Sequence, residues 1–356
     1  MNLPVTWNAS WKKHSLRFLK PSGTSRGILY EKPSYFLMLR HPEDPDISGI
    51  GECSIIPGLS PDKLENIEGK LDSICSILND GKIPPDEALN DYPALKFALE
   101  TALLDADGGG RRRLFPSEFV DAGAPIPING LIWMGSFLAM KDQIREKIDQ
   151  GYRCIKIKIG ALDFDEELKL IKHIRREYID LNISIRLDAN GAFKLHDAIE
   201  KLNILSEQHI HSIEQPLRPG QWEDMAALCE VSPIPIALDE ELIGWHDEKE
   251  RKKLIDAIQP AYVILKPSLL GGLEEAGKWA KLAEAYGIGW WVTSALESNI
   301  GLNAIAQWTA TLKNPMEQGL GTGSLYSNNL PSPLYTQGGN LWHDTAASWD
   351  LRYLIP

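Results

Sequence analysis

The chain has 356 residues, of which 43% are apolar and 24% are charged, a composition typical of globular proteins with a large core. At about 150 residues per domain, this length predicts two domains, or one barrel with an addition. Lysine and arginine number 37 against 49 acidic residues, and the formal net charge of -12 argues against nucleic-acid binding. The four cysteines form no C-x-x-C pair, which argues against a zinc knuckle or a disulfide framework.

The amino-terminal segment gives no sign of export. Residues 1–20 mix charged and apolar side chains and contain no apolar run long enough for a secretory signal. No stretch of about 18 apolar residues that could span a bilayer occurs anywhere in the chain. We therefore expect a cytoplasmic protein that has no membrane partner.

Residues 1–122 combine two kinds of periodicity. Apolar and polar residues alternate over residues 15–19 and 35–39, which predicts antiparallel strands. Helical periods follow at residues 63–78 and 94–106. This part of the chain is therefore predicted to be an α+β domain.

From residue 123 the sequence repeats a short apolar strand, a polar turn and a helical segment. Eight candidate strands begin 23 to 29 residues apart, at Ile126, Ile155, Ile183, His211, Ile234, Tyr262, Gly289 and Gln318. Eight parallel strands joined by helices close into a barrel. The predicted fold class is α/β, a (β/α)7β TIM-like barrel over residues 123–330 with the α+β domain as its cap. Residues 331–356, which are rich in Pro, Gly and Ser, are expected to pack on that cap.

Ionisable side chains end five successive candidate strands, at the face where such barrels carry their active sites. They are Lys158, Asp188, Glu214, Asp239 and Lys266, and Lys156 shares the strand face of Lys158. The second and sixth strands are opposite in an eight-membered ring. The lysines at 158 and 266 are therefore expected to face each other, with the carboxylates along one wall between them.

Three converging carboxylates would repel one another unless a cation held them, and oxygen ligands suit Mg²⁺. A single strand lysine is usually solvated, and a single Asp at a strand end usually caps the next helix. Five such residues at the same barrel end are harder to explain by capping. Arg186 and Asn190 share the face of Asp188 and are candidate partners of the metal ligands, with a purely structural ion pair as the alternative.

Several motifs resemble those of the enolase superfamily, in the lysine–lysine subgroup that includes muconate cycloisomerases. They are K-x-K at 156–158, R-L-D-A-N at 186–190, E-Q-P at 214–216, L-D-E at 238–240 and L-K-P at 265–267. Within that subgroup, three further segments resemble the o-succinylbenzoate synthases, a family of dehydratases in menaquinone biosynthesis. They are G-E-C-S-I-I-P-G-L-S at 51–60, N-G-L-I-W-M-G at 129–135 and G-L-G-T-G-S-L-Y at 319–326.

The resemblance implies Mg²⁺ as cofactor, for which Mn²⁺ can substitute, held by Asp188, Glu214 and Asp239. It implies Lys158 as the base and Lys266 as its partner across the ring. The implied substrate is a small dicarboxylate, 2-succinyl-6-hydroxy-2,4-cyclohexadiene-1-carboxylate, which loses water to become aromatic. Removal of a proton next to a carboxylate creates a second negative charge, which a metal ion and a lysine ammonium can stabilise.

Substrate recognition is expected from loops around the barrel mouth. Residues 22–27, which include Arg26, and the segment 51–60 correspond to cap loops that close over the barrel in relatives. Ser294, Thr322 and Gly323 are candidates for binding a second carboxylate through hydroxyls or backbone amides, and simple turn chemistry is the alternative.

Other functions use the same lysines. N-acylamino acid racemase, dipeptide epimerase and cycloisomerase activities are the alternatives, because two lysines can exchange a proton on either face of one carbon. Dipeptide epimerases of this subgroup usually carry Asp-x-Asp after the last strand, where residues 321–324 here read G-T-G-S. A non-catalytic barrel is the alternative from another class, and the intact lysines and carboxylates argue against it. The sequence leaves the oligomeric state open.

Overall fold

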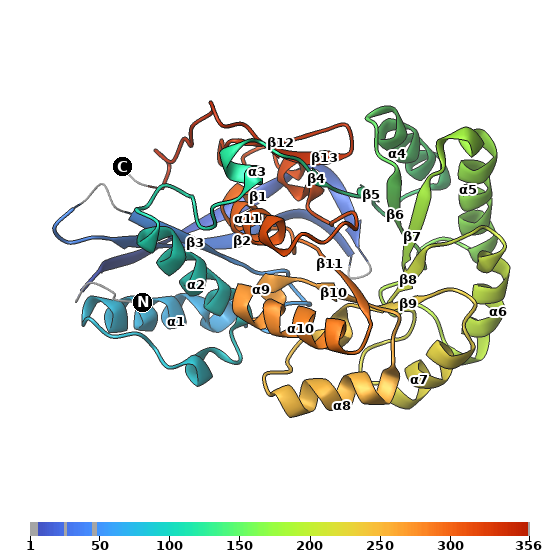
Figure 1. The fold of residues 1–356 in the computed structure, drawn as a ribbon, viewed down its shortest axis with the longest axis horizontal. Helices are drawn as coiled ribbons and strands as arrows, with labels where there is room; N and C mark the ends of the chain where they lie inside the picture. The colour runs from blue at the N-terminus through green and yellow to red at the C-terminus, as the bar shows by residue number, and fades with distance from the viewer. Residues whose placement is uncertain (1–5, 25–26, 45–47, 355–356) are drawn as a thin grey trace.

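In the computed structural model, which describes residues 6–24, 27–44 and 48–354, an antiparallel cap sheet lies beside a curled parallel sheet surrounded by helices (Figure 1). The cap sheet has the order β1-β2-β3, and the parallel sheet runs from β5 to β11. A third, small sheet joins the carboxyl-terminal hairpin to the start of the barrel. This arrangement confirms the predicted fold class, a barrel-like α/β domain with an α+β cap.

The cap is built from three strands and two long helices. They are β1 (Asn8–Thr24), β2 (Gly27–Arg40), β3 (Ser48–Ser54), α1 (Leu64–Asn79) and α2 (Pro93–Asp107), with a 3-10 turn, η1 (Asp86–Leu89). Helix α2 lies directly on β3 because β3 presents glycines to it. A Cβ atom at Gly49 or Gly51 would overlap the carbonyl oxygen of Ala102 or Ala98, respectively. Small residues thus permit the close contact that buries this face of the sheet.

The hairpin of β1 and β2 is longer than the sequence predicted. Residues 22–27 are predicted to be a cap loop, but β1 continues through Thr24 with a register shift between Arg17 and Ser22. Near its tip, Gly23 forms a bridge to Met134, and a Cβ atom there would clash with the Met134 carbonyl oxygen. The hairpin therefore reaches across to the mouth of the barrel.

Seven parallel strands form the barrel sheet. They are β5 (Gly130–Ile132), β6 (Cys154–Lys158), β7 (Ser184–Asp188), β8 (Ser212–Glu214), β9 (Ile236–Leu238), β10 (Tyr262–Leu265) and β11 (Gly289–Val292). Along β6, Ile155 and Ile157 are fully buried against the helices, while Lys156 and Lys158 face the interior of the barrel. Because side chains alternate between the two faces of a strand, the isoleucines of β6 pack against the helices and its lysines are directed into the barrel.

Helices cover the outside of this sheet in the order of the strands (Figure 1). The longer ones are α4 (Phe137–Asp149), α5 (Phe164–Glu177), α6 (Leu195–Ser206), α7 (Trp222–Val231), α8 (Glu248–Ile258), α10 (Leu273–Ala285) and α11 (Asn299–Leu312). Short turns of helix are α3 (Glu118–Asp121), η2 (Ile179–Leu181), η3 (Glu240–Leu242), α9 (Pro267–Leu270) and η4 (Gly321–Leu325). Within the described residues, no helix is long and apolar enough to cross a membrane.

The structure differs from the prediction at the two ends of the barrel sheet. The first candidate strand splits, because β4 (Ile126–Pro127) pairs with the carboxyl-terminal hairpin and only β5 joins the parallel sheet. At the eighth position, Gln318 and Gly319 form isolated bridges to Ile128 and Thr293 instead of a continuous strand. The first and last strand positions of the barrel are therefore joined by an isolated bridge, between Ile128 and Gln318, and not by a continuous ladder of hydrogen bonds.

The carboxyl-terminal segment contacts both parts of the molecule. Strands β12 (Leu334–Gln337) and β13 (Asn340–His343) form a hairpin that pairs with β4. Farther along, Trp349, Leu351 and Leu354 pack with Phe36 and Ile50 of the cap sheet. The exact domain boundaries, at residues 122 and 330, stay predictions.

A buried carboxylate ties the cap to the barrel. Glu52 on β3 is fully buried and accepts hydrogen bonds from the backbone N–H of Ser298, at 2.9 Å, and of Gly301, at 3.0 Å. It also accepts from the hydroxyls of Ser298 and Ser34, at 2.6 and 2.7 Å. Glu52 thus satisfies free N–H groups at the start of α11, where the helix dipole also favours a negative charge.

Replacing this carboxylate should weaken the whole fold. We expect Glu52→Ala to lower the free energy of unfolding by about 3 kcal/mol, because it leaves several buried donors without an acceptor. Glu52→Gln, which keeps one acceptor oxygen, should cost less. Urea denaturation followed by circular dichroism measures both, with Glu65→Ala on the exposed face of α1 as the control. Equal stability of the Glu52→Ala and Glu65→Ala variants would show that the hydrogen bonds of Glu52 to the start of α11 do not stabilise the fold.

Candidate active site

Six charged side chains from five consecutive strands meet at the carboxyl end of the barrel. They are Lys156, Lys158, Asp188, Glu214, Asp239 and Lys266, the set that the sequence singled out. Register places three of them side by side, because Asp188 pairs with Lys158 on one neighbouring strand and with Glu214 on the other. The carboxylates are almost fully buried, so the energy of this cluster depends on how their charges are balanced.

Lys156 lies at the centre of the cluster. Its Nζ is 2.9 Å from Oδ2 of Asp188 and 2.6 Å from Oε2 of Glu214. Burial by itself would lower the pKa of Lys156, but the charges of Asp188, Glu214 and Asp239 outweigh burial and raise the pKa above its usual value. Lys156 is therefore an ammonium that bridges two carboxylates.

Lys158 lies at one end of the carboxylate wall. Its Nζ donates to Oδ2 of Asp188 at 3.0 Å and to Oδ1 of Asn190 at 2.8 Å. Asn190 has a positive φ of 44° and in turn donates from Nδ2 to Oε1 of Glu240 at 3.0 Å. Asn190, a predicted partner of the ligands, is thus held where it contacts the lysine.

Lys266 lies at the other end of the wall. Its Nζ donates to Oδ2 of Asp239 and is 3.9 Å from Oε1 of Glu214. Burial opposes the charged form, but the attraction of Asp239 and Glu214 is larger and raises the pKa of Lys266. Lys266 is therefore an ammonium, as the sequence-based interpretation requires.

The carboxylates respond to burial and to one another. Burial, together with repulsion from Asp188, raises the pKa of Glu214 against the opposing charge of Lys156. Burial likewise raises the pKa of Asp239 against the opposing charge of Lys266. For Asp188 burial is outweighed by Lys156 and Lys158, which lower its pKa. The wall thus concentrates negative charge in a desolvated place and holds it only with positive charge beside it.

The donor chemistry of this wall fits a hard divalent cation, since all three groups are carboxylates from adjacent strands. In the described part of the chain, however, no three acidic, histidine or cysteine side chains are arranged as a ready set of metal ligands. The ammonium groups of Lys156 and Lys266 lie between the carboxylates instead. A cation would therefore compete with these ammonium groups for the same oxygens.

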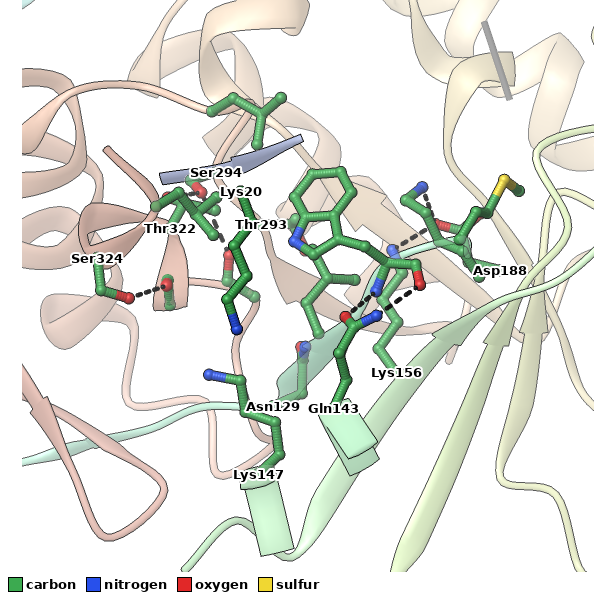
Figure 2. Close-up of a pocket in the computed structure, with 18 of the residues that line it drawn as sticks. Lys20, Asn129, Gln143, Lys147, Lys156, Asp188, Thr293, Ser294, Thr322 and Ser324 are labelled. Carbon is green, nitrogen blue, oxygen red and sulfur yellow. Dashed lines mark hydrogen bonds and ion pairs between the residues drawn. The ribbon is translucent and has the colours of Figure 1, made fainter. Parts of the chain in front are cut away.

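The cluster opens into a cavity of about 1230 Å³. Lys158, Asp188 and Lys266 lie on its barrel side, and the cap closes it with residues of the β1–β2 hairpin and of the segment after β3, namely Leu19, Lys20, Pro21, Leu29, Ile56, Pro57 and Leu59. Figure 2 shows Lys156 and Asp188 on one side of this space and Ser294, Thr322 and Ser324 on the other. The cap thus contributes apolar walls to a charged barrel floor.

The predicted substrate-binding residues have different positions. Ser294 and Thr322 line the cavity, and their hydroxyl oxygens are 2.6 Å apart. Gly323 is not among the described lining residues, because it faces Asn299 and Leu302, which a Cβ atom there would overlap. A role of the Gly323 backbone in binding the substrate stays a prediction. Arg26 lies outside the described residues.

Arg186 is directed away from the carboxylates. It precedes Asp188 by two residues, so it lies on the same face one level nearer the amino-terminal end of the barrel. Its guanidinium donates to the carbonyl of Glu317 at 2.7 Å and lies 4.1 Å from the ring centre of Trp291. These contacts favour the structural alternative over a role beside the metal ligands.

Sequence reasoning gave no role to three residues that the structure brings to the site. Glu240 lines the cavity and binds Asn190. Gln215, at a positive φ of 42°, accepts from the N–H of Asp239 at 3.2 Å and so links two ligand-bearing strands. Asn129 lines the cavity with a buried side-chain oxygen that finds no hydrogen-bond partner among the described residues. Glu240 and Gln215 belong to the L-D-E and E-Q-P motifs, so their position in those motifs was an available signal.

Comparisons with known proteins agree with this geometry. Residues 139–344 match the family described as enolase C-terminal domain-like. The chain is 48% identical to the o-succinylbenzoate synthase of Desulfotalea psychrophila, over 93% of this chain and 98% of that protein. The crystal structure of MenC from the same organism superposes with a TM-score of 0.84 at 45% identity, covering 95% of this chain and 99% of the other.

A more distant likeness concerns the fold alone. The muconate lactonizing enzyme of Pseudomonas fluorescens has a TM-score of 0.83 at 24% identity, over 98% of both chains.

Enzymes of the superfamily generally use a divalent metal ion. The resemblance found in the motifs is thus confirmed, and the chain is an enzyme. It belongs to the enolase superfamily, with residues 139–344 in the enolase C-terminal domain-like family.

Proposed function

We propose that this chain is an o-succinylbenzoate synthase, a dehydratase that converts 2-succinyl-6-hydroxy-2,4-cyclohexadiene-1-carboxylate into 2-succinylbenzoate with the help of Mg²⁺. The observation that carries the proposal is a buried wall of three carboxylates with a lysine at each end, Lys158 beside Asp188 and Lys266 beside Asp239. The similarity to the Desulfotalea psychrophila enzyme, which extends over nearly the whole of both chains, supports this substrate.

Asp188, Glu214 and Asp239 would hold the metal ion. When bound, the ion supplies positive charge beside the substrate carboxylate and so favours loss of the neighbouring proton. Lys156 has a separate role, since its ammonium keeps two of the carboxylates together. Mn²⁺ offers the same preference for oxygen ligands and is expected to substitute.

Lys158 takes the proton from the carbon next to the substrate carboxylate. Its contacts with Asp188 and Asn190 fix the position of Nζ at the cavity surface, where this atom can accept the proton. Removal of this proton leaves a second negative charge on the carboxylate group beside the reacting carbon. Lys266, held as an ammonium by Asp239, places positive charge against the charge that develops.

The hydroxyl group then leaves as water with the proton that Lys158 has taken up, while the extra electron pair forms a carbon–carbon double bond of the ring. This step is favoured because the ring becomes aromatic. The cap residues over the cavity exclude water while the charged groups act, which strengthens their interactions with the substrate. The proposed reaction, on a small dicarboxylate, is a step of menaquinone biosynthesis. We further propose that the enzyme acts in the cytoplasm.

Metal removal tests the role of the carboxylates. Exhaustive chelation should abolish turnover, and Mg²⁺ or Mn²⁺ should restore it, since the positive charge on the substrate carboxylate would be lost and regained. Asp239→Asn should weaken metal binding by about 100-fold, measured as the metal concentration for half-maximal activity. Asp180→Asn, on an exposed 3-10 turn, is the control. Full activity of the protein after removal of metal by the chelator would contradict the assignment of these carboxylates as metal ligands.

Lysine substitutions separate the base from the charge partner. Lys158→Ala should lower kcat by about 100- to 10,000-fold, the usual contribution of a general base. Lys266→Ala should lower kcat by about 100- to 1,000-fold, because a developing negative charge loses its counter-charge. Steady-state kinetics measures both, with Lys169→Ala on the exposed face of α5 as the control. Wild-type turnover by Lys158→Ala would mean that another group is the base.

Substrate comparison distinguishes dehydration from racemisation. The absorbance of the cyclohexadiene should fall rapidly with this enzyme. Dipeptides should show negligible α-proton exchange in D₂O, since residues 321–324 offer no carboxylate for an ammonium group, and N-succinyl amino acids should exchange slowly. A higher kcat/KM for any dipeptide or N-acylamino acid than for the cyclohexadiene would replace the dehydratase by an epimerase or racemase.

A further inference from the structure

The cavity has a side branch that the proposed chemistry does not use. Besides the lysines and carboxylates at the barrel mouth, it is lined by Asp142, Glu146, Lys147 and Gln150 toward the end of α4, by Tyr152 and by Thr336 of β12. Of the two carboxylates, Asp142 is paired with Arg145 and Glu146 with Lys20. These residues belong to the helix layer and to the carboxyl-terminal hairpin, which lie outside the barrel sheet (Figure 1). The cavity therefore extends through the barrel wall.

The incomplete eighth strand creates this passage. The first and last strands are joined at Asn129, whose N–H donates to the carbonyl of Gln318 at 2.9 Å. Beyond that point the wall is formed by Gly321, which has no side chain to fill the gap. A Cβ atom at Gly321 would lie 3.8 Å from the carbonyl oxygen of Asn129 and 4.0 Å from the hydroxyl of Tyr152. Tyr152 thus reaches the cavity from outside the sheet.

The branch contains a desolvated cation. Lys147 is partly buried, and among the described residues no carboxylate lies within 4.0 Å of its Nζ. Its polar contact is with Oε1 of Gln150 at 3.4 Å, and its Nζ lies 4.9 Å from the ring centre of Tyr152. Burial lowers the pKa of Lys147; the charge of the neighbouring Glu146 opposes this effect, and the charge of Lys20 adds to it. Glu146 itself lies 3.8 Å from the Nζ of Lys20. Figure 2 shows the ends of Lys20 and Lys147 turned toward each other.

A second polar group faces the passage. Asn129 lies between Lys147 and Lys156 in Figure 2, and its buried Oδ1 has no hydrogen-bond partner within the described part of the chain. A primary amide can present either its oxygen or its nitrogen to a ligand. Buried polar groups without partners are rare in native proteins, so this amide oxygen, in a cavity that is also lined by an ammonium without a carboxylate partner among the described residues, is a feature of a binding site.

Ser294 and Thr322 are weaker candidates for an anion. Their hydroxyls already contact each other, and Ser294 also lies 3.4 Å from the carbonyl oxygen of Gly319. Neither carries a charge. A carboxylate that leaves water gains more from an ammonium than from hydroxyls that have partners.

We infer that the branch binds the carboxylate at the far end of the substrate's succinyl chain, with Lys147 as its counter-charge and Asn129 bonding to the chain. This inference rests on the proposed function, because that substrate carries two carboxylates. The first belongs beside the reacting carbon at the barrel mouth. The second, at the end of a flexible chain, then enters the opening between the first and last strands.

Kinetics of Lys147 variants tests the inference. Lys147→Met should raise KM for the cyclohexadiene by about 10- to 100-fold, the effect of losing one charged hydrogen bond. Its kcat should stay within about threefold of wild type, since Lys147 does not touch the reacting atoms. Lys147→Arg, which keeps the charge, should recover most of the lost affinity. Lys169→Met on α5 is the matched control, and thermal unfolding checks that each variant is folded.

A modified substrate separates the carboxylate from the rest of the molecule. When the succinyl carboxylate is replaced by a carboxamide, wild type and Lys147→Met should have the same KM within about twofold, because the charge pair is absent from both. Binding of 2-succinylbenzoate, measured by calorimetry, should weaken in Lys147→Met to the same extent as KM rises.

The possible failures are distinguishable. Wild-type turnover together with unchanged KM and unchanged 2-succinylbenzoate binding in Lys147→Met would overturn the subsite and leave the dehydratase standing. Wild-type protein that neither turns over the cyclohexadiene nor binds 2-succinylbenzoate would overturn both. A drop in kcat with unchanged KM in folded Lys147→Met would also contradict the subsite, since it would place Lys147 in the reaction itself.

Discussion

The balance of charge among three buried carboxylates and three lysines governs the barrel mouth. Asp188 and Glu214 share the ammonium of Lys156, and Asp239 is paired with Lys266. Separating any of these charges from its partners in a desolvated place would cost several kcal/mol, so the six side chains act as one unit. The same negative wall that holds ammonium groups has the donors that a divalent cation requires.

The architecture supplies this unit with fixed positions and a cover. Strand register sets Lys158 beside Asp188 and Asp188 beside Glu214, while buried isoleucines on the opposite faces of the strands anchor them against the helices. The cap is attached through Glu52, which binds the start of α11. That helix begins shortly after Ser294 at the cavity wall, so one buried carboxylate couples the position of the cap to the substrate side of the barrel.

The incomplete eighth strand of the barrel lets the cavity extend outward between the first and last strands. A complete eighth strand would close the wall beside β5, whereas isolated bridges leave an opening that Gly321 does not fill. Tyr152 and Lys147 then reach the interior from the helix layer. An irregularity in the sheet thus creates room and positive charge for the part of a ligand that lies away from the reacting carbon.

The sequence by itself determined the barrel repeat, the six charged residues at the strand ends and the family. Strand alternation and short motifs involve residues that are close together in the chain, so both can be recognised without the tertiary structure. It did not determine the split first strand, the bridged eighth strand, the true extent of β1, or the positions of Gly323 and Arg186. Those depend on which backbone groups find partners far along the chain. Only the tertiary structure decided that Lys147, Asn129 and Gly321 line one cavity. They lie on helix α4, between β4 and β5, and at the start of η4, and no local pattern encodes contacts between such distant segments.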